Sequence, residues 1–171
     1  MSDNRILRVG ITQGDINGIG PEVIIKALAD NRVPEMFTPV IYGASKAFSY
    51  YKKGIEGAEA FSFQVIGSAR EARGKRINFI ETAKGEIKLE PGTPSKESGD
   101  QAVAALRAAV QDLKDGLIDV IVTAPINKEN VQQSGLGATG HTEFFAAEFG
   151  GKPLMAMCSD IMKVGLATIH I

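Results

Sequence analysis

The sequence of 171 residues predicts an α/β fold, a sandwich in which a largely parallel sheet lies between layers of helices. Two observations support this expectation. Short apolar runs typical of buried strands alternate along the chain with segments in which apolar residues recur at helical spacing. In addition, a glycine-rich stretch after the first run leads into a segment that opens with Pro21, and proline is favoured in the first turn of a helix.

The expected elements follow in order. We expect strands at residues 6–12, 39–43, 61–66, 77–82, 118–123, 154–158 and 164–171. The expected helices are residues 22–29, 45–53, 98–115, 127–133 and 142–149. Ser98 and Gln101 match a capping box at the start of the long helix, and Gly116 ends it. Residues 118–123 and 164–171 have the continuous apolar character of fully buried strands.

Composition excludes several classes of protein. The net charge of −1 argues against nucleic acid as a partner, because such binding normally needs a basic face. Cys158 is the single cysteine, which fits a reducing compartment. No apolar run approaches the ~20 residues of a membrane helix, and no signal peptide is recognisable, so we expect a cytoplasmic protein without membrane contact. Because the sequence stops at Ile171 inside an apolar run, we also expect a truncated product or a fragment.

The glycine-rich stretch contains Gly14, Asp15, Gly18 and Gly20 and lies between a strand and a helix. Its spacing is not the G-x-G-x-x-G fingerprint of dinucleotide-binding domains. Two interpretations stay open. Glycines would let the backbone approach a cofactor or an anion at the helix start, with Asp15 bonding a ribose or a substrate. Alternatively, the stretch is only a tight turn into the helix.

Two further segments carry candidate ligand contacts. Lys128 follows a strand at the edge of the sheet where α/β proteins bind ligands, and it is either an anion contact or, more commonly, a solvated lysine. His141 and Thr142 lie where a glycine loop meets a helix and could hold a phosphate or carboxylate, or Thr142 is a simple N-cap. His170 ends an apolar strand, where histidine is more often a core residue than a metal ligand, and the chain has only two histidines.

Six stretches in order resemble the family of 4-hydroxythreonine-4-phosphate dehydrogenases of pyridoxal phosphate biosynthesis. They are residues 11–15, 18–22, 98–99, 123–128, 140–145 and 167–170. Residues 18–22 are also similar to the loop of isocitrate and isopropylmalate dehydrogenases, whose fold the family shares. The resemblance implies an α/β/α sandwich of that type with two lobes, the first covering residues 1–125 and a second, dimer-forming lobe beginning at residues 126–171.

The resemblance also implies site roles and cofactors. His141 and Thr142 would contact a phosphorylated small-molecule substrate, and His170 would bind a divalent metal, which could be zinc, magnesium, manganese or cobalt. The cofactor would be NAD or NADP, and the protein would be a homodimer. The implied reaction oxidises 4-phosphooxy-L-threonine, and the product then loses carbon dioxide to give 3-amino-2-oxopropyl phosphate.

Two departures from the family pattern stand out. Ile16 and Asn17 follow Asp15 where the family usually has proline. The family's other two metal histidines and its main phosphate-binding residues belong to its second half, so we expect this chain by itself to be inactive. Alternatives are a sister dehydrogenase for a threonate or erythronate 4-phosphate, a half-protein kept for binding or dimerisation, and, more remotely, a metal-free phosphate acyltransferase.

Overall fold

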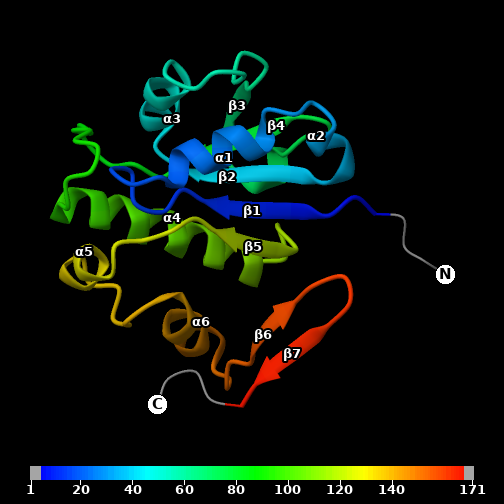
Figure 1. Cartoon of the computed structure of the whole chain (residues 1–171), viewed down its shortest axis with the longest axis vertical. Helices are drawn as coiled ribbons and strands as arrows, with labels where there is room; N and C mark the ends of the chain where they lie inside the picture. The colour runs from blue at the N-terminus through cyan, green and yellow to red at the C-terminus, as the bar shows by residue number, and fades with distance from the viewer. Residues whose placement is uncertain (1–4, 168–171) are drawn as a thin grey trace. The chain divides into compact units, whose positions relative to one another are not determined.

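The computed structural model describes residues 5–167 and divides into two units, with the division after Gly135. A parallel sheet of five strands forms the centre of the first unit (Figure 1). The strands pair in the order β3-β4-β2-β1-β5, and Gly10 at the middle of β1 pairs with Val40 on one side and Ile121 on the other. The strands are β1 (Arg8–Thr12), β2 (Thr38–Gly43), β3 (Phe63–Ile66), β4 (Ile77–Glu81) and β5 (Val120–Thr123).

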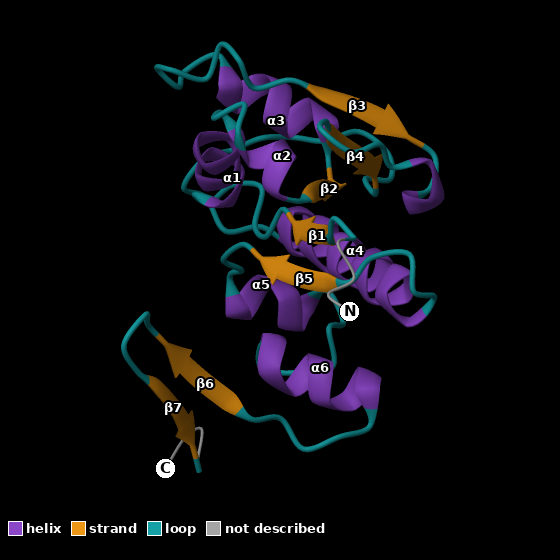
Figure 2. Cartoon of the chain, turned by 90° about the vertical axis from the view of Figure 1, so that its right-hand side faces the viewer, coloured by secondary structure: helices purple, strands orange, loops and turns teal. Residues whose placement is uncertain are grey.

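Helices cover both faces of this sheet, so the predicted α/β/α sandwich is confirmed. Figure 2 shows α1, α2 and α3 on one side and α4 on the other. Because parallel strands must be joined by crossovers, α1, α3 and α4 each lie in a connection that returns the chain to the starting edge of the sheet. The helices are α1 (Gly20–Leu28), α2 (Val33–Met36), α3 (Ser45–Lys52), α4 (Lys96–Lys114) and α5 (Lys128–Gln133), with a 3-10 turn at Ala69–Glu71.

Two separate cores hold the layers together. On the α1 and α3 side, Phe48 packs edge-on against Phe79 with ring centroids 5.2 Å apart, and Phe63 packs on the same ring. On the α4 side, the small side chains of the helix bring it close to β2, and the Tyr42 hydroxyl donates a 2.7 Å hydrogen bond to Asp112 of α4. Burial, together with this bond, raises the pKa of Tyr42.

The order of the strands changes direction between β1 and β5. From β1 the chain continues through α1 to β2 on one side of β1, whereas α4 carries it back to β5 on the other side. The helix that follows β5, α5, contacts α4, so the loops after β1 and β5 lead to helices on opposite faces. Ligands in open α/β sheets bind at the carboxyl ends of the strands at such a switch point.

The start of α4 differs from the prediction. The N-cap is Ser95, whose hydroxyl accepts a 3.1 Å bond from the Ser98 N–H, so the capping box predicted at Ser98 and Gln101 is wrong. Ser98 and Gln101 instead lie in the helix with buried side chains. Both serines are followed by plausible helix residues, so local sequence did not distinguish them. The short helix α2 was not predicted at all.

Strand β5 is not the fully buried strand that its apolar sequence predicted. Val120 and Val122 are 42% and 50% exposed, because β5 lies at the edge of the sheet within the described chain. On the flank of that edge strand, an apolar hollow between β5, α1 and α2 is lined by Val23, Met36 and Val122 among others.

The second unit contains α6 (His141–Phe149) and an antiparallel pair, β6 (Met155–Cys158) and β7 (Lys163–Leu166). The strand predicted at residues 164–171 is confirmed over its described part by β7, but its predicted burial is wrong, since Val164 is 38% exposed. Apolar side chains around the hairpin are also exposed, including Leu154, Met157 and Ile161. Among the helices of the described chain, none has the length and apolar character needed to cross a membrane.

Candidate functional site

The candidate site lies at the carboxyl ends of β1 and β5, which run toward α5 and the beginning of α4 (Figure 1). Here the glycine-rich loop after β1 touches the loop after β5. The Asp15 N–H donates a 2.9 Å bond to the Pro125 carbonyl. Gly14 has a φ of 69°, and a Cβ placed there would lie 2.2 Å from the same oxygen. Only glycine therefore allows the two loops to approach this closely.

A hydrogen-bonded chain joins three segments that are far apart in sequence. The two amide hydrogens of Asn130 point to the Asp15 carboxylate at 3.3 Å and to the Ser98 hydroxyl at 3.1 Å. The Ser98 hydroxyl in turn donates a 2.9 Å hydrogen bond to the Ser95 carbonyl. The other Asp15 oxygen accepts the Asn17 N–H at 2.8 Å. These bonds hold the Asp15 carboxylate in place at the carboxyl end of β1. The residue is only partly buried there and can accept further hydrogen bonds.

Gln13 anchors the same loop through two hydrogen bonds of its side chain. Its side chain is fully buried, and its carbonyl accepts the Ala44 N–H at 2.7 Å at the end of β2. Its amide donates toward the Gln101 carbonyl on α4 at 3.4 Å. The loop is therefore tied to both layers of helices, which restricts its movement relative to the sheet.

The departure at Ile16 and Asn17 has a structural role. Ile16 is buried, and its carbonyl accepts a 2.7 Å bond from the Tyr51 hydroxyl. Asn17 bonds the segment before α4 three times, through the Thr93 carbonyl, the Glu90 N–H and the Gly92 N–H. These two residues therefore attach the segment before α4 to the glycine-rich loop.

The glycines of the loop divide by function. Gly14 and Gly20 are required by the fold, since a Cβ on Gly20 would lie 2.3 Å from the Gln13 carbonyl. This supports the tight-turn interpretation at these two positions. Gly18 is exposed, and a Cβ there would make only ordinary contacts, the nearest at 3.5 Å. Helix α1 starts beside it without a side-chain cap. Gly18 is therefore the glycine of the loop whose presence the packing does not explain.

The loop after β5 contains the residue that caps α5, but the cationic side chain that follows it, Lys128, is not held by an ion pair among the described residues. Asn127 caps α5, and its side-chain oxygen accepts the Asn130 N–H at 3.1 Å. Lys128 is exposed and makes no ion pair within residues 5–167. Lys128 starts α5 after the carboxyl end of β5, and its role as an anion contact stays a prediction.

His141 and Thr142 lie in the second unit, at the beginning of α6. The N-cap is Gly140, so the alternative of Thr142 as N-cap is wrong. The His141 ring stacks on Phe145 with centroids 6.2 Å apart. Its Nε2 is buried and has no hydrogen-bond partner in the described structure. Burial lowers the pKa of His141, so the ring is neutral at neutral pH.

This histidine makes stability depend on pH. The unfolded chain takes up a proton near the ordinary pKa, before the folded chain does, so stability is retained above that value and lost as the pH falls through the lowered pKa of His141. We expect the free energy of unfolding in urea to fall between about pH 7.5 and about pH 5.5. His141→Asn should flatten this dependence. Equal slopes for wild type and His141→Asn would contradict the prediction.

The predicted metal ligand, His170, lies outside the described residues. Within residues 5–167 no three histidine, cysteine or acidic side chains are grouped so that they could hold a metal ion.

Sequence reasoning missed Asn130, which connects Asp15 to Ser98. Its only signal was its position one turn after a capping asparagine, which is too common to be diagnostic.

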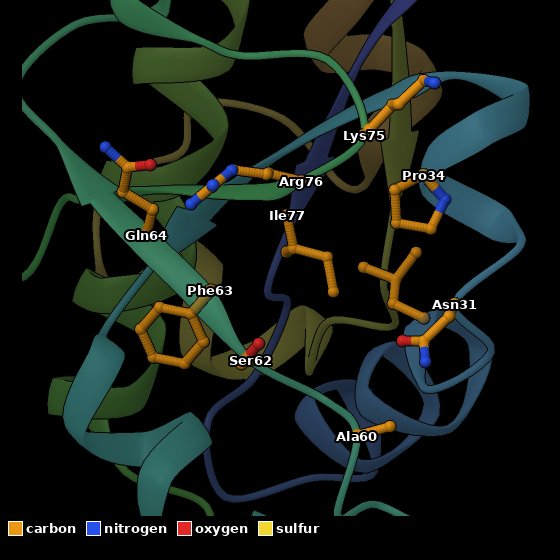
Figure 3. Close-up of a pocket in the computed structure, with 10 residues that line it drawn as sticks. Asn31, Pro34, Ala60, Ser62, Phe63, Gln64, Lys75, Arg76 and Ile77 are labelled. Carbon is orange, nitrogen blue, oxygen red and sulfur yellow. The ribbon is translucent and has the colours of Figure 1, made fainter.

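Another cavity, of about 440 Å³, lies at the opposite edge of the sheet, beside the beginnings of β3 and β4 (Figure 3). It has two cationic side chains, Lys75 and Arg76. In Figure 3 Arg76 extends toward Gln64, whereas Lys75 extends toward the helix of Pro34. Because the two cations point in different directions, they do not form a shared anion site.

Comparison with known proteins bears on the family. The family model for "Pyridoxal phosphate biosynthetic protein PdxA" matches residues 35–171. A 4-hydroxythreonine-4-phosphate dehydrogenase of Bacteroides thetaiotaomicron is 41% identical over 173 residues, covering 100% of this chain and 47% of the relative. A D-threonate 4-phosphate dehydrogenase of Bordetella bronchiseptica is 31% identical over 98% of this chain and 49% of its own length.

The fold agrees with these relatives. The crystal structure of a 4-hydroxythreonine-4-phosphate dehydrogenase from Burkholderia phymatum superposes with a TM-score of 0.83 at 32% identity, covering 98% of this chain and 51% of that one. The chain thus spans about half the length of the relatives it matches. From the matched model and the shared fold, this chain belongs to the PdxA family of pyridoxal phosphate biosynthetic proteins, whose relatives are named as dehydrogenases.

Proposed function

We propose that the whole protein oxidises 4-phosphooxy-L-threonine with NAD and that the product then loses carbon dioxide to give 3-amino-2-oxopropyl phosphate. The observation that carries this proposal is the 41% identity to the Bacteroides 4-hydroxythreonine-4-phosphate dehydrogenase across the full chain. The anchored loop at the switch point supports it, because Asp15 and the exposed Gly18 lie where α/β proteins bind ligands. NADP is the alternative cofactor.

In this proposal His141 and Thr142 bind the substrate. The buried, unpartnered Nε2 of His141 supports that role, since a buried nitrogen without a partner is costly unless a ligand or water bonds it. A neutral ring can donate from one nitrogen and accept at the other, so it can orient a hydroxyl or a phosphate oxygen. Fixing the reacting group in this way can supply several kcal/mol of the barrier. Lys128 is proposed as a further anion contact.

A divalent metal, which could be zinc, magnesium, manganese or cobalt, is part of the proposal. The described residues do not make a metal site by themselves, and His170 would supply one ligand. A bound divalent cation polarises oxygen groups and lowers the pKa of a coordinated hydroxyl. Since the described residues form no metal site and His170 would supply only one ligand, we propose that the chain of 171 residues alone does not turn over.

We further propose a homodimer whose second lobe, beginning within residues 126–171, forms the contact between subunits. The exposed apolar side chains of the β6–β7 hairpin, Met157, Ile161 and Met162, support this. The first lobe would span residues 1–125. A cytoplasmic location is proposed because Cys158, the single cysteine, fits a reducing compartment.

A sister activity, oxidation of D-threonate 4-phosphate, is favoured by the Bordetella relative. The two substrates differ in an amino group against a hydroxyl. We expect NADH formation by the whole protein to give a kcat/KM about 100-fold higher with 4-phosphooxy-L-threonine, because a site that bonds an ammonium group discriminates against its absence. The reverse preference would establish the sister activity. Formation of neither NADH nor NADPH from either substrate would refute both.

A further inference from the structure

A buried asparagine on α5 connects the glycine-rich loop to α4. Asn130 is 3% exposed, and its side chain carries two amide hydrogens. One of them bonds the Asp15 carboxylate at 3.3 Å, and the other bonds the Ser98 hydroxyl at 3.1 Å. The opposite orientation of the amide would place its oxygen against a carboxylate, which accepts hydrogen bonds and cannot donate them. Asn130 therefore faces Asp15 as a donor.

The Ser98–Gly99 pair, one of the six stretches that resemble the family, forms the place in which Asn130 lies. A Cβ on Gly99 would lie 2.4 Å from the Asn130 carbonyl oxygen and 2.6 Å from the Ser134 hydroxyl. Both distances are too short for a real Cβ, so α5 approaches α4 this closely only because position 99 is glycine. Ser98 is fully buried and accepts one amide hydrogen. The pair thus fixes both the backbone and the side chain of Asn130.

Packing alone does not explain an amide at position 130. An apolar side chain of similar size would fill the same space, whereas a buried amide costs free energy unless its hydrogen bonds are made. One of the Asn130 bonds goes to Asp15, which is only partly buried at the carboxyl end of β1. The other Asp15 oxygen accepts the Asn17 N–H at 2.8 Å. Each carboxylate oxygen thus has a fixed donor and keeps the capacity to accept a further bond.

We propose that Asn130 is a positioning residue, whose amide holds the Asp15 carboxylate in the orientation in which that carboxylate accepts a hydrogen bond from a bound ligand. The inference rests on the proposed dehydrogenase function. Asn130 acts through Asp15 and does not touch the ligand itself, because its side chain is buried and both amide hydrogens are bonded. Such positioning matters for turnover, since a displacement of about 1 Å can lower a rate about 100-fold.

The alternative is a purely structural role, in which Asn130 only attaches α5 to α4 and to the loop. Asn78 provides a matched control for that role. It is fully buried, and its amide donates to three backbone carbonyls. It lies near the amino end of β4, whereas Asp15 follows the carboxyl end of β1. Asn78→Ala therefore removes a buried, hydrogen-bonded amide that is not part of the candidate site.

The test is a double-mutant cycle in the whole protein with Asp15→Ala, Asn130→Ala and both together. The measured quantity is kcat/KM for 4-phosphooxy-L-threonine or D-threonate 4-phosphate, whichever the wild type oxidises faster. We expect Asp15→Ala to lower kcat/KM about 100-fold, because a charge-assisted hydrogen bond to the ligand is lost. Asn130→Ala should lower it about tenfold, because the carboxylate is present but no longer held. The double variant should equal Asp15→Ala, because nothing is left to position.

Stability measurements separate positioning from structure. Asn130→Ala and Asn78→Ala should both lower the melting temperature, because each removes buried hydrogen bonds. Only Asn130→Ala should lower kcat/KM, measured well below that temperature. If Asn130→Ala does not fold, Ser98→Ala replaces it in the cycle, since it removes the partner of the other amide hydrogen and leaves the bond to Asp15. We expect a loss of about threefold, which should be absent when position 15 is alanine.

Several outcomes would overturn the inference and leave the proposed dehydrogenase standing. One is a double variant whose loss is the product of the single losses, about 1,000-fold, because Asn130 would then act independently of Asp15. Another is wild-type kcat/KM in either single variant. A third is an equal loss in Asn78→Ala, which would assign the effect to stability. Absence of turnover by the wild type would instead overturn the proposed function, and this inference with it.

Discussion

Replacing Gly14 by alanine is expected to destabilise the protein by about 3 kcal/mol. Alanine at a φ of 69° is strained, and its Cβ would lie 2.2 Å from the Pro125 carbonyl oxygen. That oxygen belongs to the backbone, so no side-chain rotation relieves the clash. The loops after β1 and β5 would have to separate, which displaces Asp15 from its bond to Pro125. Chemical unfolding in urea measures the loss.

The matched control is Gly57→Ala. Gly57 has a φ of 80°, but nothing lies within 4 Å of a Cβ placed there. The strain of the backbone is thus similar and the clash is absent. We expect this variant to lose about 1 kcal/mol. If both variants lose the same free energy, the close approach of the two loops is not what requires glycine at position 14.

Removing the metal should have the largest effect on activity. We expect a chelator, and separately His170→Ala, to reduce turnover of the whole protein by at least about 100-fold, because the cation is proposed to contribute several kcal/mol to the chemical step. Metal content measured by mass spectrometry should fall in the variant in parallel. Activity of the chelated wild type should return when zinc, magnesium, manganese or cobalt is added back.

The controls guard against simple unfolding. The circular dichroism spectrum of His170→Ala should match that of the wild type, and added metal should not restore the variant. Full turnover after complete removal of metal would eliminate the metal proposal. Full turnover of His170→Ala with bound metal would show only that another residue is the ligand.

Hydrophobic periodicity predicted the strands and helices of the first unit well, but it predicted their burial poorly. The strand before the glycine loop and the helix after it were predicted within two residues, because apolar spacing and Pro21 are local signals. Burial of β5 was predicted wrongly. An apolar run reports that a strand is suited to a core, but the position of β5 at the sheet edge follows from strand order, which no local pattern encodes.

The candidate site shows the same division. The loop that contains Gly14 and Asp15 was predicted from sequence, because glycines mark a strand-to-helix loop, and it lies between β1 and α1. Gln101 was found, but with the wrong role, as part of a capping box. Its burial inside α4 follows from the position of the true N-cap, Ser95, three residues before Ser98.

The sequence by itself determined the alternation of strands and helices, the place of the glycine-rich loop and the family pattern of motifs. Only the tertiary structure decided that Asn130 bonds Asp15 and Ser98, and that β5 lies at the edge of the sheet among the described residues. The physical reason is separation along the chain. Asp15 and Asn130 lie 115 residues apart and meet because parallel strands bring their following loops to one edge of the sheet.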